Sequence, residues 1–146
     1  MQLWEPAYTT LLSKKPDMRT IDLAIADSWK KFTGSRDIPY LGVAAHVDWV
    51  EKHQNLVPKL YRAYQEAAEW VTAHPDEASK LIAPKSTPDD QKAIAALIRA
   101  NDRLGMNVKW ASDVGKEIKS VYAAGKSIAF LPSEPSDQTI YRAPGK

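Results

Sequence analysis

The chain has 146 residues, and its 20 Lys and Arg against 18 Asp and Glu give a formal net charge of +2. This length fits one ordinary domain, and the near-neutral balance gives no electrostatic basis for binding nucleic acid or acidic membranes. The absence of cysteine excludes disulfides, thiolate metal sites and cysteine catalysis, and no apolar run approaches membrane-spanning length.

The first third of the sequence predicts a short helix followed by two strands. Residues 3–14 (LWEPAYTTLLSK) suit a helix because Pro6 falls in its first turn, where a missing N–H has no cost. Residues 18–25 (MRTIDLAI) have alternating and then continuous apolar character, which predicts a strand. Residues 38–46 (IPYLGVAAH) are apolar nearly throughout, with Pro39 at the start, and predict a buried strand.

Helices are predicted to dominate from Val47 onward. A helix from Asn55, its N-cap, to about His74 shows the clearest three-four apolar spacing in the chain. Pro75 ends this helix and begins the next one at once, because proline lacks a donor and disfavours helical conformation in the residue before it. The pattern therefore predicts two helices that meet at an angled joint. The expected core face of the first helix is formed by Leu60, Tyr61, Tyr64, Ala67, Ala68 and Val71.

Three further helical segments are predicted after the joint. Residues 75–83 place apolar side chains onto the same core, and a helix at about 87–104 is capped by Ser86 or Thr87. A last helix at about 112–124 ends before Gly125, and the proline-rich tail is expected to be irregular. The residues expected to be buried in these helices are Ala78, Leu81, Ile82, Ile94, Leu97, Ile98, Leu104, Val114, Ile118 and Val121.

No pattern in the sequence is typical of catalysis or metal binding. His46, His53 and His74 include no pair at i, i+4, and no carboxylate completes a ligand set with them. The acidic pairs at 76–77 and 89–90 lie in first helical turns, where charge–dipole stabilisation accounts for them. The glycines are scattered, and no nucleophile elbow surrounds a serine. We therefore expect a protein that is not an enzyme, with no catalytic residue, no metal and no cofactor.

Aromatic residues give the main indication of a ligand site. The five tryptophans and six tyrosines are many for a chain of this size, although helix packing accounts for those between residues 61 and 70. The segment WEPAY is different because it places Trp4, Glu5 and Tyr8 at a helix start. Helix N-termini and aromatic walls are features that small polar ligands use.

Two stretches carry a family resemblance: residues 3–12 (LWEPAYTTLL) and 38–83 (IPYLGVAAHVDWVEKHQNLVPKLYRAYQEAAEWVTAHPDEASKLIA). In order, they resemble the substrate-binding proteins of nitrate/sulfonate/taurine-type ABC importers. In that family a W-x-P-type segment is followed by a strand, a short helix and a long helix pair with a proline at its joint. The counterparts here are residues 49–57 for the short helix and 67–70 with 74–78 for the pair. The match covers most of this chain but only about the C-terminal half of a family member.

The resemblance implies an α/β fold, namely the helix-rich C-terminal portion of a periplasmic-binding-protein type II-like fold with few strands and an incomplete sheet. Residues 1–37 would be the tail end of the second lobe, and residues 38–46 the strand that crosses between lobes. Residues 47–146 would be the C-terminal helical part of the first lobe, as a single compact unit. The ligand-binding residues that the resemblance implies are Trp4, Glu5, Tyr8 and Tyr40.

The resemblance also implies a function. The protein would be the solute-binding component of an ABC importer, or a fragment of it, that binds a small anionic or polar-aromatic solute between two lobes and delivers it to a membrane permease. It would use no cofactor, bind no nucleic acid and not insert into the membrane. The full-length protein would be periplasmic or extracytoplasmic, although this chain carries no signal peptide. Since the family's N-terminal half has no counterpart here, we expect an unpaired sheet edge and a homo-oligomer if the chain is truncated.

Two other interpretations stay open. One is a self-contained helical protein-interaction module with no small-molecule ligand. The other is the thiamine-pyrimidine synthase branch that shares the receptor architecture. That enzyme branch is expected to use histidine and a cysteine-rich motif, so the absence of cysteine argues against it.

Overall fold

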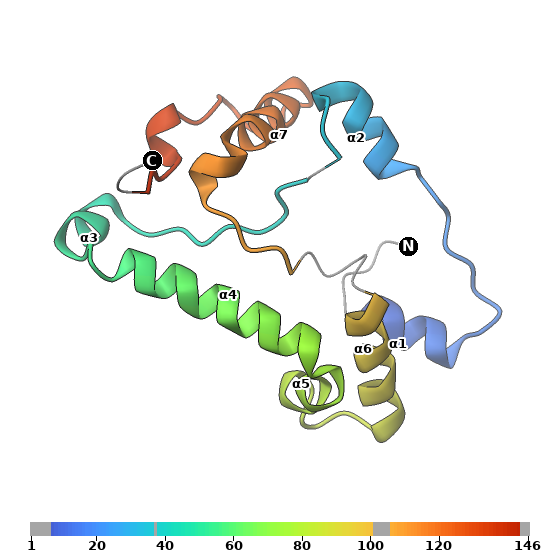
Figure 1. The fold of residues 1–146 in the computed structure, drawn as a ribbon. Coiled ribbons are helices and arrows are strands. Elements are labelled where there is room, and N and C mark those ends of the chain that lie inside the picture. The colour runs from blue at the N-terminus through green and yellow to red at the C-terminus, as the bar shows by residue number, and fades with distance from the viewer. Residues whose placement is uncertain (1–6, 37, 101–105, 144–146) are drawn as a thin grey trace. The chain divides into compact units, whose positions relative to one another are not determined.

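The computed structural model describes residues 7–36, 38–100 and 106–143 (Figure 1). Of these residues, 62% are helical and none forms a strand. The chain divides into two units that interleave in sequence. Unit 1 is formed by Met1–Ile21 and Arg62–Val108, and unit 2 by Asp22–Tyr61 and Lys109–Lys146. None of the described helices combines the length and the apolar character needed to span a membrane.

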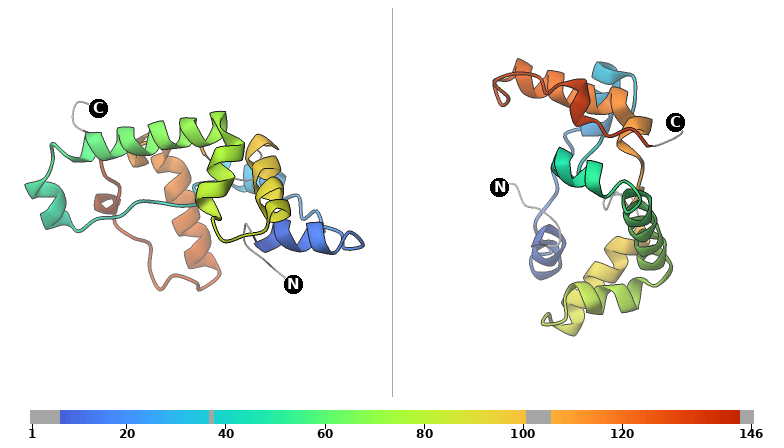
Figure 2. Two further views of the ribbon diagram at one scale, coloured as in Figure 1. Left: turned by 90° about the horizontal axis from the view of Figure 1, so that it is seen from below. Right: turned by 90° about the vertical axis from the view of Figure 1, so that its left-hand side faces the viewer.

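Unit 1 is held together by its last helix. Its helices are α1 (Ala7–Lys14), α4 (Val57–Ala73) from Arg62 onward, α5 (Pro75–Ile82) and α6 (Pro88–Ala100). Helix α6 packs against both α5 and α1, and these neighbours lie side by side in each view (Figures 1 and 2). Ala78, Ile94 and Ile98 form the buried cluster, with Val71 and Ala83 packed against it. The core of unit 1 therefore lies mainly between α5 and α6.

The predicted joint between α4 and α5 is confirmed. Helix α4 ends at Ala73, α5 begins at Pro75, and His74 between them has non-helical dihedral angles (φ −126°, ψ 59°). His74 serves both helices, because its N–H donates to the Trp70 carbonyl at 2.9 Å and its own carbonyl accepts from the Ala78 N–H at 2.8 Å. Its ring also stacks on Trp70, with centroids 5.0 Å apart. The chain therefore bends without leaving these backbone groups unpaired.

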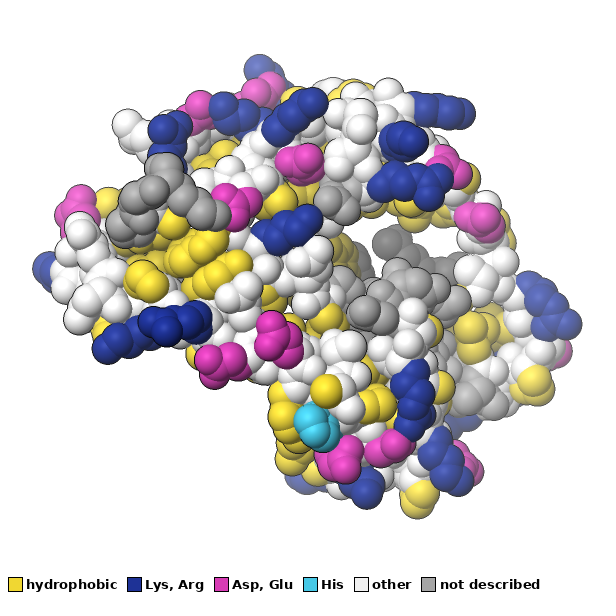
Figure 3. All heavy atoms as spheres, in the orientation of Figure 1, with side chains coloured by type: hydrophobic (Ala, Val, Ile, Leu, Met, Phe, Trp, Pro, Cys, Tyr) yellow, Lys and Arg dark blue, Asp and Glu magenta, His cyan; other side chains and the backbone are white. Residues whose placement is uncertain are grey.

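Unit 2 contains several helices but few buried residues. Its elements are α2 (Ile25–Thr33), α3 (Val47–Lys52), the first turn of α4, the 3₁₀ helix η1 (Ala111–Val114), α7 (Gly115–Ser127) and the 3₁₀ helix η2 (Asp137–Thr139). Tyr61 stacks on Trp110 at 4.1 Å between centroids, and Tyr141 lies against the same indole at 6.0 Å. Among its described residues, Ala143 alone is buried. Hydrophobic side chains lie between charged ones over the face of the chain that Figure 3 shows.

The expected α/β fold with an incomplete sheet is wrong for the described residues. Residues 18–24 and 38–46 are neither helix nor strand, and Ile25 begins α2. The expected burial of residues 38–46 is also wrong, since Leu41 is 88% exposed. A strand is stabilised by pairing with a neighbour, and the described residues supply none. The apolar pattern matches the composition of a strand, but it does not show whether a second strand is available to pair with it. The assignment of lobes along the sequence stays a prediction.

The predicted core is partly confirmed. Ile94, Leu97 and Ile98 of α6 and Ala78 of α5 are buried, as expected, and Leu104 lies outside the described residues. The expected burial of several other side chains is wrong, because in the structure they are exposed: Leu60, Tyr64 and Ala67 on α4 and Leu81 and Ile82 on α5. The apolar stripe of α4 identifies a face that suits burial, yet in the described part of the chain no other helix packs extensively against it.

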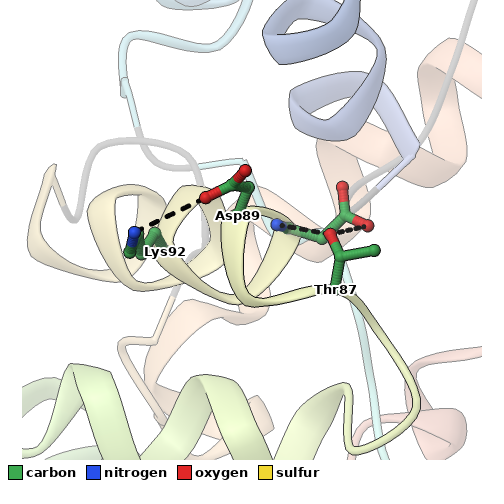
Figure 4. A network of polar contacts seen from close by, with 4 residues as sticks. Thr87, Asp89 and Lys92 are labelled. Atoms are coloured by element: carbon green, nitrogen blue, oxygen red, sulfur yellow. Dashed lines mark hydrogen bonds and ion pairs between the residues drawn. The ribbon is translucent and has the colours of Figure 1, made fainter.

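The start of α6 is closed by Thr87, one of the two predicted caps (Figure 4). The Asp90 N–H donates to Thr87 Oγ1 at 3.2 Å, and the Thr87 hydroxyl donates to Asp90 Oδ2 at 2.9 Å. The hydrogen bond from Thr87 holds the pKa of Asp90 below its ordinary value, and the positive charge of Lys14, 3.5 Å away, acts in the same direction. Thr87 thus caps one backbone N–H of α6, and the Asp90 carboxylate holds the Thr87 hydroxyl in place.

Replacing Thr87 by alanine is expected to lower the free energy of unfolding near neutral pH by about 1 kcal/mol, as is typical for a lost cap. Because the folded pKa of Asp90 lies below the unfolded one, its contribution is present above the unfolded pKa and lost as pH falls through the folded pKa. The difference in unfolding free energy between the original chain and Thr87→Ala should therefore become smaller below about pH 4. Urea unfolding of both proteins at several pH values measures this difference. Thr87→Ser, which keeps the hydroxyl, is the control. If the stability loss of Thr87→Ala did not change with pH, the Thr87 hydrogen bond would not be coupled to the ionisation of Asp90.

Candidate functional site

The ligand-binding residues predicted from the family resemblance are spread over different parts of the chain. Trp4 and Glu5 lie outside the described residues. Tyr8 lies on α1 in unit 1, where its hydroxyl is hydrogen-bonded to Thr20 Oγ1. Tyr40 lies in unit 2, in the non-helical segment before α3, and is 62% exposed. A ligand-binding role for these four residues stays a prediction.

Unit 2 contains a polar pocket of about 850 Å³ that the sequence did not predict. One wall is formed by η1 and the first turns of α7, and the other by the segment that returns after α7. The pocket is lined by Ser112, Asp113, Gly115, Lys116, Lys119, Ser120, Ala123, Glu134, Asp137, Ile140 and Arg142. On α7, Lys116, Lys119, Ser120 and Ala123 follow i, i+3, i+4 and i+7 spacing, which places them on one face of the helix.

The second wall depends on a tight reversal at the end of α7. The Phe130 and Leu131 N–H groups both donate to the Gly125 carbonyl, at 2.9 and 3.0 Å. Leu131 then packs so close to Gly125 that a Cβ there would lie 3.0 Å from Leu131 Cδ1. Glycine at position 125 therefore allows the returning segment to approach α7. The sequence predicted that the helix ends before Gly125, but in the structure Gly125 lies inside α7.

Two ion pairs fix the returning segment against α7. Lys119 Nζ lies 2.6 Å from Asp137 Oδ2, and Lys126 Nζ lies 3.9 Å from Glu134 Oε1. All four side chains are more than half exposed, so these pairs contribute little to stability. Their effect on the pocket is electrostatic, because they neutralise two of its three carboxylates.

The remaining charges of the pocket are mainly positive. Lys116 and Arg142 form no ion pair with the described residues, whereas Asp113 has a further interaction of its own. The Ser112 hydroxyl is buried and has no hydrogen-bond partner within the described ranges. A buried unsatisfied hydroxyl costs about 1–3 kcal/mol, and this oxygen has almost no exposed surface through which a ligand could reach it. Lys116 and Arg142 together outweigh the remaining carboxylate of Asp113, and this positive excess suits a small anion that carries a carboxylate or sulfonate group.

Comparison with known proteins adds no assignment. No family model, curated protein or solved structure matches this chain. The described residues also include no group of three or more His, Asp or Glu side chains that could hold a metal ion. The case for a function therefore depends on the residues of the pocket and on the resemblance of the helix pair.

The pocket was missed because its walls are distant in sequence. Lys119 and Asp137 are joined by an ion pair across a reversal that sequence periodicity does not describe, and the tail that contains Arg142 was expected to be irregular. One signal was available in the sequence. Lys116 and Lys119 share a face of the predicted last helix, next to the expected inward positions Val114 and Ile118.

Proposed function

We propose that this chain belongs to the solute-binding component of an ABC importer, or is a fragment of it, and that it binds a small organic anion. The observation that carries the proposal is that Lys116 and Arg142, neither of which forms an ion pair with the described residues, line one pocket of unit 2. The helix pair α4 and α5, with its joint at Pro75, supports the family resemblance of residues 38–83. Delivery of the solute to a membrane permease, and an extracytoplasmic location, follow from the resemblance.

The proposed mechanism is reversible binding without chemical change. The anion is attracted by Lys116 in the first turn of α7, where the positive end of the helix dipole adds to the side-chain charge. Arg142 offers a planar guanidinium that can donate two hydrogen bonds to a carboxylate or sulfonate. Release requires only that these non-covalent contacts break, and delivery of the solute to a permease needs such reversible binding.

Thermal-shift and calorimetric titration with sulfonates, nitrate, pyrimidines and aromatic acids tests this proposal. We expect an organic anion to bind and its affinity to fall as salt is raised. Lys116→Glu and Arg142→Glu should each weaken binding by about tenfold or more, while Arg142→Lys should retain part of it.

The matched control is Lys85→Glu, which makes the same charge change at an exposed lysine of unit 1. Its effect on anion affinity should be small. The proposal is wrong if no anion binds, or if the Lys85 variant weakens binding as much as the two pocket variants. Native mass spectrometry gives an independent readout of ligand stoichiometry.

A second candidate is a helical protein-interaction module with no small-molecule ligand. The helical character of the described residues favours it, as do the exposed aromatic side chains of unit 2, among them Phe32 and Phe130. Exposed apolar surface of this kind commonly marks protein-binding sites. In that case every compound of the panel would leave thermal unfolding unchanged, and an uncharged hydrophobic dye would bind to the isolated chain.

A further inference from the structure

The segment between α2 and α3 contains an exposed apolar stretch, Leu41 to Ala45, in a part of the chain that Figure 1 draws as neither helix nor strand. Leu41 is 88% exposed, Val43 is 66% exposed, and Val47 at the start of α3 is 70% exposed. The backbone of Leu41 to Ala45 takes part in no backbone–backbone hydrogen bond with the described residues. Both its side chains and its peptide groups are therefore available to another chain.

We propose that this segment, residues 38–47, binds the same segment of a second copy of this chain in antiparallel orientation. The charges on either side of it favour that arrangement. The upstream side carries Lys30, Lys31 and Arg36 against Asp27, which is bound to Arg36, and Asp37, so it keeps a small positive excess. The downstream side carries Asp48 and Glu51, with Lys52 at 4.0 Å from Asp48, and is negative.

An antiparallel pair places the positive side of one copy against the negative side of the other, whereas a parallel pair places like charges together. The same charges indicate the register. Arg36 and Asp48 are equally far in sequence from Gly42, so a two-fold axis at Gly42 sets Arg36 of each copy opposite Asp48 of the other. A two-fold interface of this kind is self-complementary, which is the common arrangement of homodimers.

The exposed apolar surface sets an upper limit on the interface. The exposed parts of Ile38, Tyr40, Leu41, Val43 and Val47 amount to roughly 500 Å² per copy, so even complete burial in two copies covers ~1,000 Å², the area of a weak, reversible interface. Unit 2 also needs a partner more than unit 1 does, because Ala143 alone is buried among its described residues. This inference is independent of the anion site.

A cysteine at position 42 tests both the partner and the register. The chain has no cysteine of its own, Gly42 does not have a positive φ, and no atom lies within 4 Å of a Cβ built there. Under mild copper-phenanthroline oxidation, Gly42→Cys should form a disulfide-linked dimer on a non-reducing gel. Ala45→Cys, displaced from the proposed axis, should form much less. Failure of Gly42→Cys to cross-link, or equal cross-linking of both variants, would overturn the register.

Sedimentation of the full chain over a wide concentration range tests the dimer itself. We expect a monomer–dimer equilibrium whose dissociation constant rises by about tenfold or more in Leu41→Asp/Val43→Asp. Leu81→Asp, at an exposed leucine of α5, is the matched control and should leave the equilibrium unchanged. A monomer at all concentrations, or equal weakening by the control, would refute the proposal.

Charge reversal provides a test that does not depend on the apolar substitutions. Lys30→Glu/Lys31→Glu should weaken the dimer, and adding Asp48→Lys/Glu51→Lys should restore it. A parallel dimer would be strengthened by neither set. Circular dichroism of each variant confirms that its helices are retained, so a lost dimer can be distinguished from a lost fold.

Discussion

Replacing Ile98 by alanine is expected to lower the free energy of unfolding by about 2–5 kcal/mol. Ile98 is 1% exposed and is the largest side chain in the described residues that is fully buried. It lies with Ala78 and Ile94 in the cluster between α5 and α6. The loss combines the transfer of the removed atoms with the cavity that they leave, and a core this small has few neighbours that can fill it. Urea unfolding followed by circular dichroism measures the change.

Two further variants show whether the effect belongs to this core. Ile98→Val removes a single methylene and should cost about 0.5–1.5 kcal/mol. Leu81→Ala removes an equally apolar side chain that is 71% exposed on α5, and should change stability by less than about 0.5 kcal/mol. Comparable losses from Leu81→Ala and Ile98→Ala would mean that α5 buries the face predicted from the sequence, rather than the face observed.

Local signals explain the parts of the fold that could be predicted. Pro75 ends one helix and begins another through its own ring and missing N–H, and Thr87 caps α6 through a hydrogen bond three residues away. The buried stripe of Ile94, Leu97 and Ile98 follows from helical periodicity once α6 is established. Each of these signals acts within one or two turns, so the sequence contains all of the information needed.

The predictions that were wrong or missing concern features that depend on a partner distant in sequence. Residues 38–46 have the composition of a buried strand, but composition does not supply the second strand that pairing needs. The stripe of α4 has the correct spacing, yet Leu60 and Tyr64 stay exposed because no helix covers them in the described part of the chain. The candidate pocket has the same origin, since Arg142 joins Lys116 only after the chain has reversed near Gly125.

Enlarging Ala78 to leucine is expected to lower the free energy of unfolding by about 1–3 kcal/mol, because the added atoms must enter a closely packed space. Ala78 is 1% exposed and packs with Ile94 and Ile98, so α5 approaches α6 over a small side chain. Thermal and urea unfolding measure the change. Ala67→Leu, at an exposed position of α4, should have little effect.

The combination of both core substitutions provides the sharper test. Ile98→Ala removes volume where Ala78→Leu adds it, so the double variant should lose less stability than the two single variants together, with a coupling of about 1 kcal/mol or more. Strict additivity would contradict direct packing of the two side chains. Coupling of the expected sign would mean that a small residue at position 78 sets the distance between α5 and α6. The joint at Pro75 must then position α5 at that distance from α6. A local feature of the sequence would thus determine the packing of the only buried cluster of unit 1 that the described residues contain.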